Sequence, residues 1–226
     1  MYLRLKAPFA AFRSFQSGSY RSTTPIPSPS TVYGLLLNLA GIEQRGETTQ
    51  PITPIRENLP SIELAIAIPS GSNSEKAIFS QQLHTYPVGS SGKDLAKKTY
   101  GAKYWIVPVR REVLVNLDIV VGVKATQELC DRILQGLNGE LNETRYGVPF
   151  AGDNNFFFDE ISVSETTPFA RWYCPLEVEE RPKRGVCRLT TWIDREDNTK
   201  TQTQVFVPSE FVLTPPDQAW ISLPPP

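Results

Sequence analysis

Hydroxyl and arginine side chains surround a predicted helix start near residue 28. Ser28 is a good N-cap and Pro29 suits the first helical position. The first 34 residues hold four basic residues and no acidic one. Because the amides and dipole at a helix N-terminus attract anions, the pattern predicts a phosphate site. A core helix beside merely solvated arginines is the alternative. The candidate residues are Arg13, Arg21, Ser28, Ser30 and Thr31.

A second basic stretch runs from residue 76 to residue 111. It holds seven Lys or Arg residues and one acidic residue, Asp94. Lysines suit phosphates, and the interleaved aromatic rings can stack on unpaired bases, so the stretch predicts a nucleic-acid surface. A solvated loop that Trp105 ties to the core would show the same residues. The candidates for RNA contact are Tyr86, Lys93, Lys97, Lys98, Tyr100 and Lys103.

The two halves of the chain carry opposite charge. Residues 1–111 hold 13 Lys or Arg and 6 Asp or Glu, whereas residues 112–226 hold 10 and 18. The halves therefore carry +7 and −8, which give the net charge of −1. We expect RNA to bind the first half. The second half, and above all its strands between about 156 and 207, should face protein partners or solvent.

Two further motifs are suited to contact with a phosphate chain. Arg110 and Arg111 lie in a strand pattern, so their side chains should point to opposite faces of the sheet. One would reach RNA and the other would pair with Glu112 or a neighbouring subunit, and the sequence leaves open which. Arg145 and Gly147 belong to a glycine loop, which permits close backbone approach but serves equally well as a plain turn.

The sequence does not indicate other site chemistries. Residues 88–93 resemble a phosphate loop only superficially, because a proline replaces the first Walker glycine and an aspartate follows the lysine. Cys130, Cys174 and Cys187 are odd in number and widely spaced, so neither a disulfide framework nor a zinc site is predicted. We therefore expect no catalytic residue, no metal and no cofactor.

Two helices among β-strands are expected to position these residues. The first spans 29–40 and ends at Gly41; the second follows Thr126, runs to about Leu137 and ends at Gly139. This arrangement fits a split β-α-β pattern in the α+β class. The predicted strands are 2–5 (continued irregularly to 15), 62–68, 77–85, 104–115, 117–123, 156–163, 170–178, 186–193 and 202–207, with a Pro-rich tail from Pro215.

The composition is that of a globular protein. With 226 residues, of which 40% are hydrophobic, the chain can form one large domain or one domain with an appendage. Twenty prolines indicate many short elements joined by stiff turns. The chain has neither an apolar run long enough to span a membrane nor a signal-peptide pattern at its start, so we expect a cytoplasmic protein without a membrane partner.

Several segments resemble one known family. The most specific is F-x-x-F-R-S-F at residues 9–15, followed by T-P-x-P-S-P-S-T-V-x-G-L-L at residues 24–36. The supporting segments are QQLHTYP at 81–87, VPVRREVLV at 107–115 and YGVPFAGDN at 146–154. On these segments, across roughly the first two thirds of the chain, the protein resembles the fifth CRISPR-associated protein family (Cas-five). Members of that family cap the 5′ end of the guide RNA in type I surveillance complexes, often called Cascade.

The resemblance implies a fold and a set of partners. It implies a ferredoxin-like, RRM-related core at residues 1–165 with a β-hairpin thumb inserted at about 81–107, and a small C-terminal β module at 166–226. It also implies a subunit that binds the 5′ handle of CRISPR RNA, caps the filament of the repeated backbone subunit and docks the large subunit. Target DNA would be reached indirectly. Because the core lacks an RNP1-type run, RNA contacts are expected from loops and thumb.

A metal-independent endoribonuclease is the main alternative. Some relatives cut the CRISPR repeat themselves with Tyr, Lys and His residues, and His84, Tyr86 and Lys103 could take those roles. Nothing in their spacing requires this, and the sequence looks more like subtypes with a separate nuclease. We therefore expect His84, the only histidine, to be non-catalytic. A generic RNA-binding module outside CRISPR systems is a third possibility.

Overall fold

The computed structural model describes residues 1–13, 20–46, 52–85, 105–176 and 184–225, without the side chains of 83–85 and 105–107. Over these ranges the chain is mixed α and β, which confirms the α+β class. No helix in the described ranges is long and apolar enough to cross a membrane. In chain order the elements are β1 (Tyr2–Ala10), β2 (Tyr20–Arg21), α1 (Pro29–Leu39), β3 (Ile62–Pro69), β4 (Glu75–Thr85), β5 (Trp105–Lys124), α3 (Gln127–Asn138), β6 (Glu160–Ser164), β7 (Ala170–Pro175), β8 (Cys187–Trp192), η1 (Asn198–Lys200), β9 (Gln202–Val212), η2 (Asp217–Ala219) and β10 (Ile221–Leu223).

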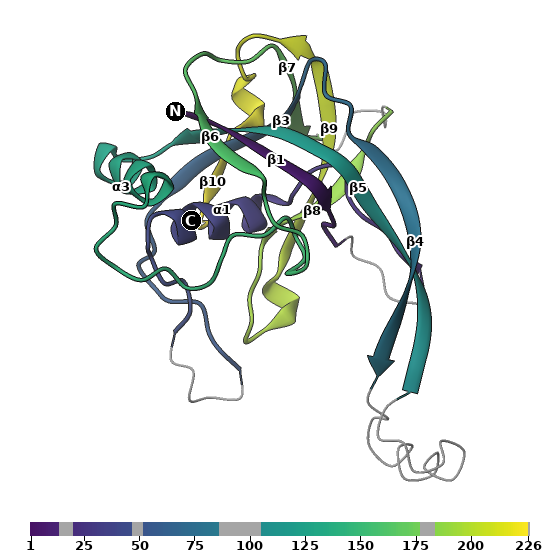
Figure 1. Cartoon of the computed structure of the whole chain (residues 1–226). Coiled ribbons are helices and arrows are strands. Elements are labelled where there is room, and N and C mark those ends of the chain that lie inside the picture. The colour runs from purple at the N-terminus through teal and green to yellow at the C-terminus, as the bar shows by residue number, and fades with distance from the viewer. Residues whose placement is uncertain (14–19, 47–51, 86–104, 177–183, 226) are drawn as a thin grey trace.

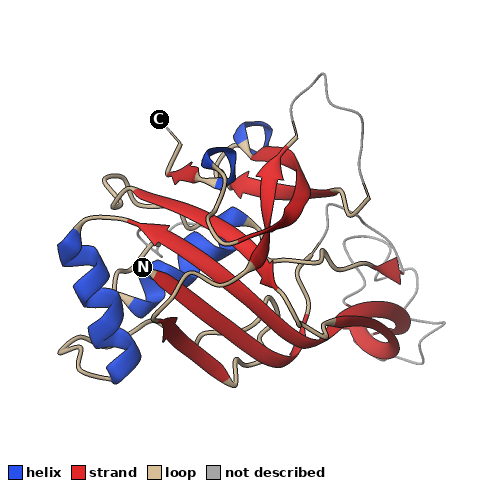
Figure 2. Cartoon of the chain, turned by 90° about the horizontal axis from the view of Figure 1, so that it is seen from above, coloured by secondary structure: helices blue, strands red, loops and turns tan. Residues whose placement is uncertain are grey.

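The strands form one large sheet. Its order is β6-β1-β5-β3-β7-β9-β8, with β10 also paired to β3, and with β2 and β4 paired to β5. The pairs are antiparallel apart from β2 with β5. Figure 1 shows β4 and the paired part of β5 projecting away from the body of the molecule. In Figure 2 the strands run across α1, and α3 stands to one side.

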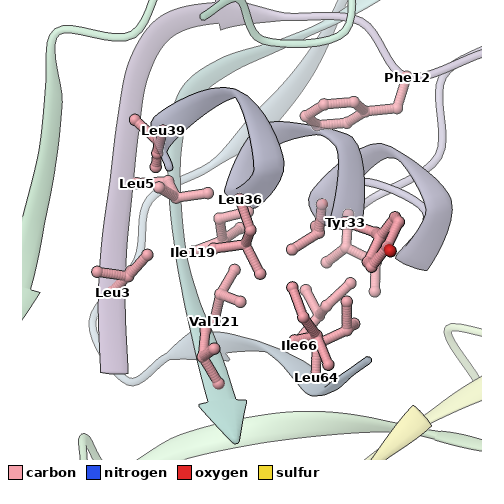
Figure 3. Packing of buried hydrophobic residues seen from close by; sticks show 14 of the residues in the cluster. Leu3, Leu5, Phe12, Tyr33, Leu36, Leu39, Leu64, Ile66, Ile119 and Val121 are labelled. Atoms are coloured by element: carbon pink, nitrogen blue, oxygen red, sulfur yellow. The ribbon is translucent and has the colours of Figure 1, made fainter. Parts of the chain in front are cut away.

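Helix α1 forms where the sequence predicts it. Ser28 is the N-cap, and its Oγ accepts a hydrogen bond from the Thr31 amide at 3.3 Å, while Pro29 opens the first turn. Gly41 follows the helix at a φ of 69°, a value that glycine adopts without strain. Figure 3 shows the apolar face of the helix against the sheet. The buried side chains at this contact include Leu36 and Leu39 of α1, Leu3 and Leu5 of β1, and Ile119 and Val121 of β5.

Helix α3 also confirms its predicted boundaries and packs on α1. Thr126 caps its start, where its Oγ1 accepts from the Leu129 amide at 3.4 Å, and Gly139 ends it in the left-handed conformation. Gly136 faces α1 so closely that an added Cβ would overlap the carbonyl group of Leu39. The lack of a side chain at Gly136 therefore sets the distance between the two helices.

The prediction of separate strands at 104–115 and 117–123 is wrong, because both belong to β5. The register against β1 runs without a break from Ala7↔Leu117 to Phe9↔Val115. Between them Asn116 has a φ of 56°, and Asn is one of the few residues that tolerate this conformation. The sequence suggested a break because the spacing of apolar residues changes at Asn116, although the backbone pairing continues.

The C-terminal residues extend the sheet instead of forming a loose tail. β7 pairs with β3, β9 pairs with β7, and β8 pairs with β9. The predicted Pro-rich tail from Pro215 contains η2 and β10, and β10 pairs with β3. Ala219 packs with the fully buried Trp172 on the sheet face that lies opposite α1. The tail is folded because Ala219 and Leu223 bury apolar surface, each retaining 1% of its exposure.

Candidate nucleic-acid interface

A groove of about 660 Å³ lies beside α1. In Figure 1 the segments that follow α1 and β8 extend below the helix, and residues of both segments line this groove. Its floor is apolar and includes Leu5, Phe12, Leu35, Ile42, Phe158 and Trp192. Five residues that the sequence predicted as RNA contacts also line it: Arg13, Ser28, Ser30, Thr31 and Gly147. The fold thus brings together candidates from three segments of the chain.

The hydroxyl groups at the start of α1 form a connected chain. Ser28 Oγ lies 3.0 Å from Ser30 Oγ and 2.8 Å from Thr31 Oγ1, and Ser30 Oγ donates to the carbonyl of Thr190 at 3.0 Å. These bonds cap the helix and tie it to β8. Ser28 and Ser30 are therefore already used by the fold, and Thr31 is the exposed member of the three.

Arg13 is held at the groove by its backbone. Arg13 forms an isolated antiparallel bridge with Thr23, and the Phe12 amide donates to Thr23 Oγ1 at 2.9 Å. The Thr24 amide donates back to the carbonyl of Phe12 at 3.0 Å. These bonds join the two ends of the segment that carries Arg13, whose side chain is exposed. A phosphate in the groove could therefore reach its guanidinium without rearrangement of the backbone.

A second group of cations meets at the base of the β4–β5 pair. Strand β2 runs parallel to β5, with Tyr20 opposite Arg110 and Arg21 opposite Arg111. Arg110 is exposed and Arg21 is half-buried. Arg21 is thus in register with the buried Arg111, whereas Arg110, its exposed neighbour in β5, points to the opposite face of the strand.

Glu112 fixes β2 in this place. Its carboxylate accepts from the Tyr20 hydroxyl at 2.7 Å and from the Thr23 amide at 3.0 Å. Lys76 Nζ lies 3.4 Å from the same carboxylate and donates to the Thr23 carbonyl at 2.9 Å. Partial burial acts to raise the pKa of Glu112, but these donors outweigh it and hold the pKa below its ordinary value. Lys76 is thus paired with Glu112, whereas the described residues show no ion pair for Arg21 or Arg110.

Arg111 faces the interior of the protein. Its side chain is 8% exposed, forms an ion pair with Asp153 and donates to Gln81 Oε1 at 3.2 Å. Burial acts to raise the pKa of Asp153, but the hydrogen bond from Arg111 and that from the Asn155 amide hold it below its usual value. The predicted opposite orientation of the two arginines is confirmed. The expected partner Glu112 is wrong, because Glu112 binds β2 and a loop carboxylate takes its place.

The loop at residues 145–152 contributes an aromatic group to the groove. Asn38 Nδ2 of α1 donates to the Tyr146 carbonyl at 2.6 Å, and Gly147 has a φ of 71°. The Arg45 guanidinium lies 3.1 Å from the centre of the Tyr146 ring. Tyr146 and Gly147 line the groove, whereas Arg145 does not.

Arg45, Tyr146 and Arg195 line the groove but were not singled out from the sequence. Tyr146 lies within one of the segments that carried the family resemblance, which is the signal that could have drawn attention to it. Arg45 and Arg195 lie in segments without a recognisable motif. Arg195 and Thr190 come from the acidic half, so residues of both halves line this groove.

The remaining candidates cannot be placed. The side chain of His84, which the nuclease alternative requires, lies outside the description, although its backbone pairs with Ile106. Six predicted RNA contacts fall outside the described residues: Tyr86, Lys93, Lys97, Lys98, Tyr100 and Lys103.

Other reactive groups in the described part of the chain are engaged in packing. Burial raises the pKa of the Cys187 thiol to about 12 and that of Tyr33 to about 12. The Tyr33 hydroxyl donates to the carbonyl of Pro60 at 2.9 Å. Among the described residues, no group of three or more His, Cys, Asp or Glu side chains could hold a metal ion.

The first part of the chain, from β1 to the end of α3, matches a known family. A family model described as CRISPR-associated protein (Cas_Cas5) matches residues 1–138, more than half of the chain. The chain belongs to this family. The match includes the arginine segment, α1 and the β4–β5 pair, whereas Tyr146, Gly147 and Arg195 follow it.

The fold of this Cas5-family protein is similar to that of a solved structure over nearly the whole chain. A chain from a "CRISPR RNA-guided surveillance complex" is 15% identical with a TM-score of 0.54, and the match covers 93% of this chain and 90% of that one. A second, from "Crystal structure of Cas protein", is 13% identical with a TM-score of 0.45, covering 92% and 93%. A search of curated proteins found no match. The first similarity shows a shared fold that includes the strands after residue 138.

Proposed function

We propose that this Cas5-family protein is a non-catalytic, RNA-binding subunit of a type I CRISPR effector complex. It binds the 5′ handle of CRISPR RNA, caps the filament of the backbone subunit and docks the large subunit. Target DNA is reached only through the assembled complex. The protein acts in the cytoplasm, without a membrane partner, metal or cofactor.

The observation that carries this proposal is the convergence of cations and hydroxyls on one side of α1. Arg13 and Thr31 line the groove, and Arg21 and Arg110 lie on the paired strands β2 and β5. Arginine contacts phosphate through charge-assisted, often bidentate hydrogen bonds. The groove and the β2–β5 pair each offer contacts to a phosphate chain. Membership of the Cas5 family supports CRISPR RNA as that ligand.

The order of the elements supports a ferredoxin-like core. The sequence β1-α1-β3-β5-α3-β6 with spatial order β6-β1-β5-β3 is that of a split β-α-β motif. We assign the thumb to the projecting β4–β5 pair and the segment that joins it. The C-terminal residues around Ala219 cover the sheet face that RRM-type domains use, which favours RNA contacts from loops and thumb.

Salt-dependent RNA binding tests the proposal. Purified full-length protein is titrated with single-stranded RNA that carries the repeat-derived 5′ end, at several salt concentrations. A triple variant, Lys97→Ala, Lys98→Ala and Lys103→Ala, should bind more weakly, and its salt slope should fall by about 0.7 for each lost phosphate contact. The matched control replaces three described basic residues of the acidic half with Ala and should bind normally: Arg184, Arg188 and Lys200. An unchanged slope in the thumb variant would remove the thumb from the interface, and no RNA binding at all would overturn the function.

The nuclease alternative is tested with the same protein. Wild-type protein and the His84→Ala variant are incubated with repeat RNA in EDTA, because the alternative chemistry requires no metal. Neither protein should cut the RNA. Specific scission by the wild type that disappears in the variant would replace the proposed function with an endoribonuclease.

A further inference from the structure

One ring face of Tyr146 is covered and the rest of the ring is open. The Arg45 guanidinium lies 3.1 Å from the ring centre, which is direct contact. Even so, Tyr146 keeps 62% of its exposure. The guanidinium packs against the ring, and Tyr146 also lines the groove, so its remaining exposed surface is available to a ligand there. An exposed aromatic face next to a cavity is a ready surface for stacking.

Hydrogen bonds hold both Arg45 and Tyr146 in place. Glu43 holds the Arg45 guanidinium through two hydrogen bonds, of 3.0 Å to Nε and 2.9 Å to Nη2. Asn38 of α1 holds the Tyr146 carbonyl at 2.6 Å. The backbone of Arg45 is bridged to Ile55. Little conformational freedom is lost when a ligand binds a platform that is already ordered, which favours affinity.

The surroundings suit a base and its phosphate. A volume of about 660 Å³ falls within the range of pockets for small organic ligands, and much of the floor is apolar. Arg13 and Arg195 line the same groove, while Glu43 is already paired with Arg45. An apolar slot with arginines at its border can receive a flat base and hold the attached phosphate.

We propose that Tyr146 is the stacking platform for one splayed nucleobase of the bound RNA, with Arg45 as the residue that positions the ring. The inference rests on the proposed function, because it names where one base of that RNA is held. An apolar side chain of a protein partner is the competing occupant. The base is favoured because Arg13 and Arg195 line the groove and Glu43, the acidic residue of its lining, is paired with Arg45.

A fluorescent base provides the test. 2-Aminopurine is placed at successive positions of the single-stranded RNA, and each RNA is titrated with full-length protein. Stacking on Tyr146 should quench one position, and the quenching should be lost in Tyr146→Ala and kept in Tyr146→Phe. Affinity should fall by about 5- to 150-fold in Tyr146→Ala, the range for one base stacked on an aromatic side chain. Phe169→Ala removes a ring of 50% exposure that does not line the groove and is the matched control.

The Arg45→Gln variant tests whether Arg45 positions the Tyr146 ring or only stabilises the fold. It removes the stacked guanidinium beneath the ring, so it should reduce the quenching at the same position while the melting temperature stays close to that of the wild type. RNA binding and quenching that are the same in Tyr146→Ala as in the wild type would overturn the subsite and leave the RNA-binding function standing. If Tyr146→Ala instead loses only the protein partner in a reconstituted complex, the groove holds a protein side chain. Wild-type protein that binds no RNA would overturn both.

Discussion

Arg13 and Arg21 reach the interface by different routes. Arg13 is exposed at the groove, and its backbone is bridged to Thr23. Arg21 lies in β2, which Glu112 fastens to the base of the β4–β5 pair. The spacing of the two arginines shows neither arrangement, because Arg13 depends on the bridge to Thr23 and Arg21 on strand β5, about 90 residues later in the sequence. At the scale of single residues, measurements of RNA affinity and thermal stability distinguish an arginine that binds RNA from one that stabilises the fold.

Arg13→Ala and Arg21→Ala should each weaken RNA binding by about 1–3 kcal/mol, the range for hydrogen bonds to charged groups. Melting temperatures without RNA should change little, because each substitution removes a contact to RNA and not a contact within the protein. Titration of labelled RNA and thermal melting give the two readouts, and Arg188→Ala in β8, an exposed arginine outside the groove lining, is the control. A large loss of thermal stability with unaltered RNA affinity would show that the arginine supports the fold.

Arg111 stabilises the fold. Its ion pair with Asp153 is largely buried, with side-chain exposures of 8% and 13%. Arg111→Ala should lower the free energy of unfolding by about 3–5 kcal/mol, because it leaves a carboxylate buried without its partner. Urea unfolding at neutral pH measures this. Glu143→Gln breaks the exposed pair with Arg132 and should cost at most about 1 kcal/mol, which makes it the matched control.

The same pair gives a pH dependence with a definite sign. The pKa of Asp153 is lowered in the folded protein, so its stabilising effect is complete above the unfolded value of about 3.9. The effect is lost as the pH falls through the lower folded pKa. The stability difference between wild type and Asp153→Asn should therefore be largest near neutral pH and shrink below about pH 4. A difference that stays constant into that acid range would show that the Asp153 charge does not stabilise the fold.

At the scale of elements, the packing of α3 on α1 requires a residue without a side chain at position 136. Alanine is normally about 1 kcal/mol better than glycine inside a helix. At Gly136, however, the new Cβ would meet the backbone of Leu39, which cannot rotate away. We therefore expect Gly136→Ala to destabilise the protein by about 1–3 kcal/mol, as overpacked cores do. Urea unfolding should show nearly no loss for Gln135→Ala, at an exposed position of the same helix. A more stable Gly136→Ala variant would mean that the helices are not this close.

The sequence predicts elements well where their signals are local. Both helices begin at the predicted caps, Ser28 and Thr126, because a cap is a matter of two or three neighbouring residues. The continuity of β5 was missed because Asn116 changes the side-chain pattern without breaking the pairing. The sequence did not predict that the residues after Pro215 are folded, because the burial of Leu223 depends on β3, far away in the sequence. Burial by distant partners leaves no local pattern.

The site shows the same division. Arg13 and the start of α1 were found because cations and hydroxyls cluster within one stretch of sequence. The pairing of Arg45 with Tyr146 joins residues about 100 positions apart, and only Tyr146 lies in a segment that carried the family resemblance. Only the fold brings them to one groove. The prediction that RNA binds the first half and protein partners the second stays a prediction.

At the scale of the whole molecule, the opposite charges of the two halves should orient the protein in its complex. Residues 112–226 carry 18 acidic residues against 10 basic ones, and an RNA strand is repelled by such a surface within a screening length of about 8–10 Å. Strand β9 carries Glu210 at an exposed position, β7 carries Arg171, and the Phe169 and Phe211 rings lie 5.6 Å apart beside them. Because aromatic groups are enriched at protein interfaces, the exposed Phe169 ring within this acidic half suits a protein partner.

Crosslinking of the reconstituted complex should reveal this orientation. RNA crosslinks are expected in residues 1–111 and at the groove, where Tyr146 and Arg195 border it. Protein crosslinks, above all to the large subunit, are expected at β7 and β9. Short-range photo-crosslinking from the RNA and a protein-specific crosslinker, both read by mass spectrometry, keep the two classes separate. Denatured complex provides the background. Abundant RNA crosslinks to residues 202–225, away from the groove, would reverse the proposed orientation, because those residues would then lie along the RNA path instead of against a protein.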